Sequence, residues 1–211
     1  MPLARVRREY RGQVLLESRS PAQPLPLLRR WLAQAMRAGL LEPNAMTLAT
    51  VDARGRPRAR MVLLKRADES GFTFYTNRRS AKARELGRRP EAALVMWWPE
   101  VHRQVRVEGR VRALTEREAD AYFATRPRGA QLGAWASPQS RVVPSRAALD
   151  RSLERASARF AGRNVERPPH WGGYRLDPRV IEFWQGRPDR MHDRLRYARS
   201  GARWTRVRLA P

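Results

Sequence analysis

The sequence predicts a mainly β fold, a small antiparallel barrel that carries a few helices. Short stretches rich in β-branched and aromatic residues recur from Ala45 onward, and hairpin-length turn sequences such as D-A-R-G separate them. Residues 103–113 alternate between apolar and polar side chains, as in a strand with one buried face. The apolar set is Val105, Val107, Val111 and Ala113. Many short strands with few helices are typical of a small barrel.

The chain begins with an arm and a helix. Residues 1–24 are expected to be a flexible extension that prolines at 21, 24 and 26 bring to an end. Over residues 27–40 the apolar side chains fall at helical spacing, so we expect a helix that packs through Trp31. Residues 25–211 are then expected to form a single domain, since 211 residues suit one domain better than two.

The remaining elements follow in chain order. Strands are expected over residues 45–51, 58–66, 71–76, 91–98, 103–113, 173–176 and 180–185, with a hairpin over 195–209. Helices are expected over residues 79–88, where Ser80 is a plausible N-cap, from the capping box Thr115-x-x-Glu118 to Pro127, and over 145–160. The stretch G-A-W-A-S-P-Q-S after Pro127 is expected to be a loop.

Composition excludes several classes of site. The chain has no cysteine, which excludes disulfides, thiolate catalysis and cysteine-based zinc sites. His102, His170 and His192 are far apart in sequence, so no metal site is expected. No apolar run approaches the roughly 18 residues that a membrane span needs, and the N-terminus has no apolar signal-peptide core. These features predict a cytoplasmic protein.

The formal charge of +24 raises the possibility of a nucleic-acid-binding protein. Arginines, however, occur in nearly every segment and form no basic block or repeat. A basic nucleic-acid-binding barrel is therefore the less favoured alternative. Against this background the chain has only two lysines, Lys65 and Lys82. These two positions are expected to need a compact ammonium group, which is a common phosphate ligand.

Several stretches have the chemistry of a binding site. Lys82 lies in the first turn of a predicted helix, where free N–H groups favour an anion. Tyr122 and Arg126, four residues apart, present a phenol and a guanidinium to one place. Arg60 and Lys65 differ by an odd number on one predicted strand and are expected to face opposite sides. Each of these features is also compatible with an ordinary surface.

The stretch Val180–Arg194 is the most informative, because an aromatic strand end is followed by a tight loop and by Arg190, His192 and Arg194. I-E-F-W-Q-G followed by R-M-H-D-R resembles the C-terminal signature of the pyridoxamine 5′-phosphate oxidase family. R-R-E-Y, R-M-V-L-L-K, F-Y-T-N, Q-V-R-V-E-G, Y-F-x-x-R-P-R, Q-L-G-A-W-A-S-x-Q-S and the closing R-L-A-P occur in the same order as in that family. The resemblance covers nearly the whole chain, from Arg7 to Pro211.

This resemblance implies a flavin-binding split β-barrel that forms a homodimer with flavin mononucleotide (FMN) at the subunit interface. It implies oxidation of pyridoxamine or pyridoxine 5′-phosphate to pyridoxal 5′-phosphate, by hydride transfer to the flavin N5 atom and reoxidation by dioxygen with release of H2O2. A flavin oxidase of the same fold acting on another substrate, of the phenazine-biosynthesis type, is the alternative enzyme.

The resemblance also implies roles for individual residues. The cofactor set is Arg60, Met61, Val62, Leu63, Leu64, Lys65, Tyr75, Thr76, Lys82, Gln104, Gln139, Ser140, Trp184 and Arg194. The substrate set is Lys65, Tyr122, Arg126, Arg190, Met191 and His192, with Arg7, Arg8, Glu9 and Tyr10 as a mobile cover. Arg190 and His192 are the implied catalytic residues: Arg190 against the pyridine ring and His192 at the reacting amine or hydroxyl.

Two positions depart from the family pattern. Ser80-Ala81-Lys82 stands where the family has Ser-Arg-Lys, and Arg78 or Arg79 is expected to compensate for the missing guanidinium. Ala130 stands where the family has a serine near the substrate phosphate. Because a lost hydrogen bond to a charged group costs roughly 1.5–3 kcal/mol, we expect weaker substrate binding than in the family at large.

Overall fold

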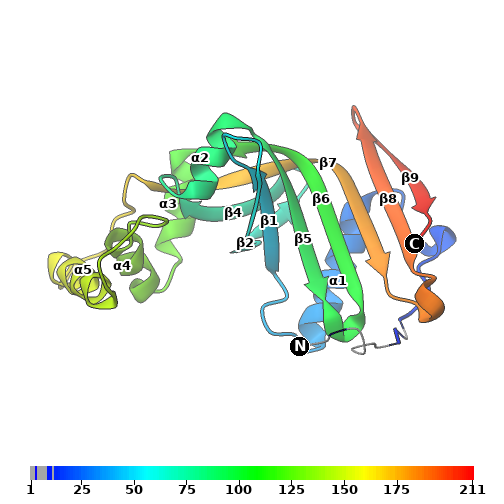
Figure 1. The fold of residues 1–211 in the computed structure, drawn as a ribbon, viewed down its shortest axis with the longest axis horizontal. Coiled ribbons are helices and arrows are strands. Elements are labelled where there is room, and N and C mark those ends of the chain that lie inside the picture. The colour runs from blue at the N-terminus through cyan, green and yellow to red at the C-terminus, as the bar shows by residue number, and fades with distance from the viewer. Residues whose placement is uncertain (1–2, 4–8, 11) are drawn as a thin grey trace.

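A computed structural model of the chain describes residues 3, 9, 10 and 12–211. Its centre is one antiparallel sheet of nine strands that curls into a partly open barrel (Figure 1). The strand order is β2-β1-β5-β6-β7-β4-β3, and β8 and β9 continue from β7. The helices α3, α4 and α5 lie together at one end of the molecule, and the β7–β8 turn lies at the other (Figure 1). The candidate site residues are therefore divided between these two ends of the molecule.

The strands are β1 (Ala45–Val51), β2 (Pro57–Leu63), β3 (Arg66–Asp68), β4 (Gly71–Asn77), β5 (Glu91–Trp98), β6 (Arg103–Ala113), β7 (Trp171–Gln185), β8 (Asp193–Ser200) and β9 (Arg203–Leu209). The α-helices are α1 (Pro24–Arg37), α2 (Ala81–Arg88), α3 (Glu116–Ala124), α4 (Arg128–Ala136) and α5 (Arg146–Arg159). Three 3-10 turns cover Glu17–Arg19, Pro99–Val101 and Pro188–Arg190.

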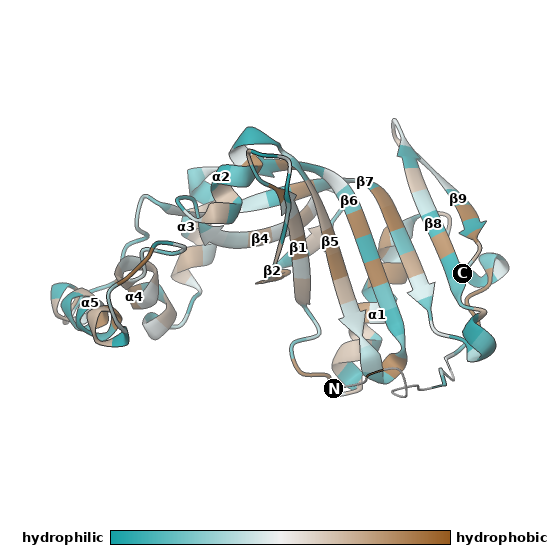
Figure 2. Ribbon diagram, in the orientation of Figure 1, coloured by the Kyte–Doolittle hydropathy of each residue, from teal (hydrophilic) through white to brown (hydrophobic). Residues whose placement is uncertain are grey.

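The barrel is filled from the inner faces of the strands and closed by α1. Val105, Val107 and Val111 of β6 are buried, as their alternation predicts, whereas Ala113 at the strand end is exposed. Hydrophobic residues alternate with hydrophilic ones along β5, β6 and β7 (Figure 2). Helix α1 buries the face that carries Trp31, whose ring meets Phe183 edge-on at 5.2 Å. The expected packing of this helix is confirmed.

A second, smaller core joins α3, α4 and α5 to the start of β7. It contains Phe123, Leu132, Phe160 and Trp171. The expected capping box at Thr115 and Glu118 is present and begins α3. Ser80 caps α2 by accepting a hydrogen bond from the Ala83 N–H at 3.4 Å. These caps fix the start of α2, which borders the candidate site, and the start of α3, whose other end borders it.

Three expected elements differ in the structure. The stretch after Pro127 is helix α4 and not a loop, because its buried Leu132, Ala134 and Ala136 pack on α5 despite two helix-weakening glycines. The expected strands 173–176 and 180–185 are one strand, β7, because Pro178 lies opposite a register shift at Gly109. The expected strand 58–66 is divided, and Lys65 lies between β2 and β3.

The bulge between β6 and β7 leaves no room for a side chain at residue 109. A methyl group on Gly109 would overlap the Asp177 carbonyl oxygen. We therefore expect Gly109→Ala to lower the free energy of unfolding by about 1–3 kcal/mol, measured by urea denaturation. Gly87, in α2, has open space around its Cα, so Gly87→Ala is the control and should stabilise by about 0.5–1 kcal/mol. Equal stability of both variants would contradict this packing.

Candidate functional site

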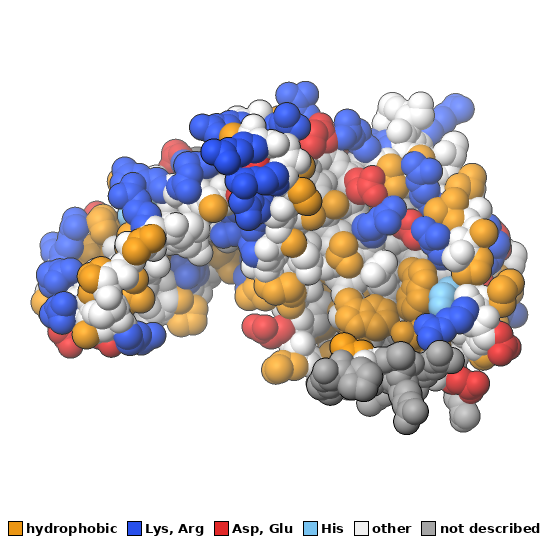
Figure 3. Space-filling model, viewed as in Figure 1, with side chains coloured by type: hydrophobic (Ala, Val, Ile, Leu, Met, Phe, Trp, Pro, Cys, Tyr) orange, Lys and Arg blue, Asp and Glu red, His pale blue; other side chains and the backbone are white. Residues whose placement is uncertain are grey.

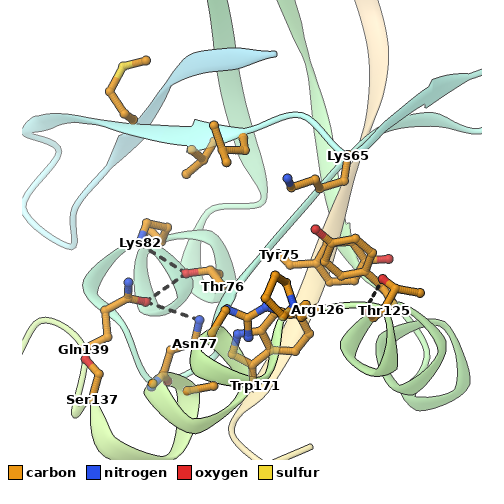
Figure 4. A pocket seen from close by; sticks show the side chains of 18 residues that line it. Lys65, Tyr75, Thr76, Asn77, Lys82, Thr125, Arg126, Ser137, Gln139 and Trp171 are labelled. Atoms are coloured by element: carbon orange, nitrogen blue, oxygen red, sulfur yellow. Dashed lines mark hydrogen bonds between the residues drawn. The ribbon is translucent and has the colours of Figure 1, made fainter. Parts of the chain in front are cut away.

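A cavity of about 600 Å³ opens between the barrel and the α3–α4 end (Figure 4). This volume is in the range typical of small-molecule sites. Its walls come from the end of β2 and the β2–β3 connection, β4, the start of α2, the end of α3, α4 with the loop after it, and the start of β7. The lining includes Met61, Val62, Leu63, Lys65, Tyr75, Thr76, Asn77, Lys82, Tyr122, Arg126, Ala130, Gln139 and Trp171.

One end of the cavity is built around Lys82. The side chain is buried at the start of α2, and its Nζ lies 3.3 Å from Thr76 Oγ1. Gln139 Oε1 accepts hydrogen bonds from Thr76 Oγ1 at 3.0 Å and from the Asn77 N–H at 3.3 Å, which ties the loop after α4 to β4. Burial lowers the pKa of Lys82, and the positive charge of Arg60 lowers it further. An anion at this end would relieve both effects.

Arg60 approaches Lys82 from β2 and is held by a buried carboxylate. Its Nη2 lies 2.7 Å from Glu85 Oε2, and the same oxygen accepts a hydrogen bond from Thr50 Oγ1 at 2.5 Å. Arg60 Nη1 also donates to Thr50 Oγ1. Glu85 was not among the residues expected from the sequence, although its place one helical turn after Lys82 puts both on one face of α2.

The other end of the cavity is aromatic and cationic. The rings of Tyr75 and Tyr122 stack at 4.0 Å, and Trp171 stacks on Tyr75 at 5.4 Å. The Arg126 guanidinium lies over the Trp171 ring at 4.6 Å. Arg126 Nη1 is buried and has no hydrogen-bond partner among the described residues. Lys65 faces this end, across the cavity from Lys82 (Figure 4). A buried donor without a partner can accept a ligand oxygen as its partner, which makes Arg126 a candidate ligand contact.

A second cluster gathers at the β7–β8 turn. The His192 ring lies 4.6 Å from that of Trp184 and 5.5 Å from that of Tyr10. Gln104 pairs with Trp184, and Trp184 pairs with Arg194 in the sheet. Arg194 Nε lies 2.8 Å from Glu182 Oε1, a carboxylate whose side chain is only 3% exposed. The Tyr10 ring is seated against Gly186, where a Cβ atom would collide with it.

The two groups of residues are at opposite ends of β7. Tyr75, in the cavity wall, pairs with Gly173, whereas Trp184 is eleven residues further along the same strand. At about 3.3 Å per residue the two positions are up to roughly 35 Å apart along the strand. Of the second cluster, neither Trp184 nor His192 lines the cavity. Within one chain, the expected site is therefore divided into two parts.

His192 is held in a defined state. Its Nδ1 accepts a hydrogen bond from the Arg187 N–H at 3.1 Å, so the neutral ring carries its proton on Nε2. Burial lowers the pKa of His192, and the positive charge of Arg190 lowers it further. Asp189 and Arg190 both have left-handed backbone conformations, with φ of 53° and 61°. Such strain is commonly found at functional sites.

The remaining expected residues are placed as follows. Leu64 is buried in the barrel core, and Ser140, with a φ of 68°, is exposed beside Gln139. Arg190, Met191 and Glu9 are exposed, and Arg7 and Arg8 lie outside the described residues. Arg78 contacts Glu116 and the Leu114 carbonyl, so its guanidinium is engaged away from Lys82. Sequence reasoning missed Asn77, Glu85, Trp171 and Glu182.

Comparison with protein families gives two matches. The family described as "Pyridoxamine 5'-phosphate oxidase" matches residues 32–160. The "Pyridoxine 5'-phosphate oxidase C-terminal dimerisation region" matches residues 171–211, which contain the second cluster from Trp184 to Arg194. No helix in the described part of the chain has both the length and the apolar character needed to cross a membrane.

Individual proteins agree with these matches. The chain is 56% identical to a pyridoxine/pyridoxamine 5′-phosphate oxidase of Thermosynechococcus vestitus over 99% of both chains. It is 54% identical to that of Pseudomonas paraeruginosa over 99% of this chain and 98% of the relative. A structure of PhzG from Burkholderia lata 383 in complex with tetrahydrophenazine-1-carboxylic acid is 36% identical, with a TM-score of 0.88 over 95% of this chain and 99% of that chain. The expected split-barrel fold is confirmed.

The environment of His192 leads to a titration test. Because burial and the Arg190 charge both lower its pKa, the imidazole should titrate below the usual value of about 6.5 in NMR spectra of the protein. Arg190→Gln removes one cause and should raise the pKa of His192 towards that value. Arg179→Gln, at the exposed start of the second half of β7, removes the same charge elsewhere and should leave it unchanged. A pKa of His192 that is the same in the wild-type protein and in Arg190→Gln would contradict the structure.

Proposed function

The chain belongs to the pyridoxamine 5′-phosphate oxidase family, and we propose that its cavity binds FMN and the phosphorylated vitamin together. The protein is an FMN-dependent oxidase that converts pyridoxamine or pyridoxine 5′-phosphate to pyridoxal 5′-phosphate, with dioxygen as the final acceptor. The observation that carries the assignment of residues is that one cavity has two cationic ends. Lys82 lines one end, with the charge of Arg60 behind it, and Lys65 and Arg126 line the other. Two phosphates, one on the cofactor and one on the substrate, match these two ends.

The residues present fit an FMN molecule. Lys82 is buried at a helix N-terminus with one hydrogen bond from the described residues, at 3.3 Å, so its ammonium has donors left for a phosphate. Met61, Val62 and Leu63 offer a strand and apolar side chains along the same wall. Thr76 and Gln139 supply further polar groups at the Lys82 end. Lys82, Arg60, Thr76 and Gln139 would hold the cofactor.

The chain's own residues account for binding and orientation. When bound, FMN supplies a hydride acceptor that dioxygen restores. Lys65, Tyr122 and Arg126 would hold the substrate phosphate, and Arg126 is already fixed in place by its stacking on Trp171. His192, neutral and with its proton on Nε2, would donate a hydrogen bond to the reacting amine or hydroxyl. Arg190 would lie against the pyridine ring.

The division of the site within one chain supports a homodimer in which each site uses both copies. The second cluster lies in the region that matches a dimerisation region. Met61 and Trp97 are 61% and 43% exposed and line a groove with Leu41 and Val95. Apolar side chains also gather on the surface over the ends of β5 and β6 (Figure 3). We propose that a second copy covers this face and brings its His192 cluster to the cavity.

The phenazine-type oxidase remains the alternative, because the PhzG structure is similar over nearly the whole chain. The end of the cavity formed by Lys65, Tyr122 and Arg126 favours a phosphorylated substrate. Ala130 lines the same end and offers no hydroxyl. The expected weakening of substrate binding at this position stays a prediction.

The two lysines test the assignment. The purified protein should be yellow and should oxidise pyridoxine 5′-phosphate. Lys82→Ala should be purified with little flavin and should regain activity only with added FMN. Lys65→Ala should keep its flavin and show a Michaelis constant raised on the order of 10- to 100-fold, because it loses a contact to a part of the substrate that does not react.

Flavin absorbance and steady-state kinetics measure both effects. Two variants that lose flavin equally, or a Lys65→Ala protein with a normal Michaelis constant, would contradict the two-phosphate assignment. A wild-type protein that binds no flavin would refute the function itself.

A mixing experiment tests the shared site. Lys65→Ala and Arg190→Ala, each impaired alone, are co-expressed with different affinity tags. In a dimer with one copy of each, one site carries both changes and the other carries neither. Random pairing should then restore about one quarter of the wild-type activity. If the whole site comes from one chain, co-expression should restore nothing beyond the two parents.

A further inference from the structure

We propose that Glu85 is the resident counter-ion of the cofactor phosphate site: it holds Arg60 beside Lys82 in the flavin-free protein and opposes the phosphate when FMN binds. The inference rests on the proposed binding of the FMN phosphate at Lys82. It concerns a residue with no polar atom assigned to either ligand. Glu85 would thus act as a positioning residue through Arg60.

Because Glu85 is buried with Lys82, its charge has a strong effect on the neighbouring cations. Glu85 and Lys82 are 9% and 8% exposed, and the Arg60 side chain is 22% exposed. Two cations at this depth repel each other, and burial already lowers the pKa of Lys82. The Glu85 charge acts on Lys82 in the opposite direction and also pairs with Arg60 at 2.7 Å. Removing one partner of such a buried group leaves the remaining charge uncompensated.

The geometry fixes Glu85 in place. Its Oε2 accepts from both Thr50 Oγ1 on β1 and Arg60 Nη2 on β2, so α2 is tied to the β1–β2 hairpin through a single oxygen. No other residue of α2 near this site can replace the Glu85 carboxylate. Arg84 is itself a cation, and it donates to the Arg79 carbonyl at 2.5 Å. Ala81 has no charge to offer. Glu85 is therefore the carboxylate that sets the charge balance of this end.

Removing the Glu85 charge should have opposite effects on the flavin-free and the FMN-bound protein. Arg60, Lys82 and Glu85 sum to one positive charge, and a bound phosphate dianion makes the group negative. The carboxylate thus stabilises the flavin-free site and opposes the phosphate. Glu85→Gln keeps the size and the hydrogen bond from Thr50 but removes the charge. It should lower the melting temperature of flavin-free protein and tighten FMN binding by about ten-fold.

Riboflavin isolates the phosphate, because it has the same ring system and no phosphate group. Dissociation constants for FMN and riboflavin are measured by flavin fluorescence on full-length protein stripped of flavin. Glu85→Gln should tighten FMN and leave riboflavin unchanged. Glu91→Gln, which removes an exposed carboxylate paired with Arg179 outside the cavity, is the matched control and should change neither.

A second variant separates charge from fit. Glu85→Asp keeps the charge but withdraws the carboxylate from Arg60, so it should lower the melting temperature of flavin-free protein without tightening FMN. The inference is overturned if Glu85→Gln binds FMN equally or more weakly, or if its riboflavin affinity changes as much as its FMN affinity. These results require wild-type protein that binds FMN. Wild-type protein that fails to bind FMN instead overturns the proposed function, and this inference with it.

Discussion

The hydrogen-bonded pairing of β7 is the interaction on which the rest of the structure depends. One edge of β7 pairs with β6 throughout, and the other pairs first with β4 and then with β8. This ladder fixes Tyr75 and Trp171 at one end and Trp184 and Arg194 at the other. A single rigid strand cannot bring its own ends together. The cavity and the His192 cluster of one chain are therefore separate, and a second copy is the simplest way to unite the two types of residue.

Electrostatics imposes a second constraint, because the chain carries a charge of +24 and still buries cations. Each partly buried site arginine has a different partner. Arg60 has Glu85, Arg194 has Glu182, and Arg126 has the face of Trp171. The carboxylates neutralise the first two, whereas an aromatic ring supports the third without neutralising it. Arg126 therefore retains the greatest demand for an anion, which agrees with its unpartnered Nη1.

The sequence predicted correctly those strands whose alternation and turn residues lie within the segment itself. The strands 45–51, 91–98 and 103–113 have the predicted bounds, since alternation and turn residues lie within each segment. Helix α4 was missed because its stability comes from packing on α5. The strand β7 was divided in the prediction because Pro178 is accommodated beside a bulge, in which β7 carries the extra residue Arg179. The family motifs supplied most of the named cavity residues, but not Asn77 and Trp171 in its wall, nor the carboxylates Glu85 and Glu182. A buried acidic residue is visible only once the fold shows which arginine it meets.

The two lysines of an arginine-rich chain have different physical explanations. Lys82 is buried beside Thr76 and within reach of the Arg60 charge, where a guanidinium would bring five donors that need partners. A compact ammonium, whose proton affinity falls on burial, suits that position. Lys65 is exposed between β2 and β3, so burial does not demand an ammonium there. Under the proposed assignment, a substrate phosphate would account for the ammonium at Lys65. A point charge would then attract the phosphate, while the stacked Tyr75 and Tyr122 rings and the planar Arg126 guanidinium would set its orientation.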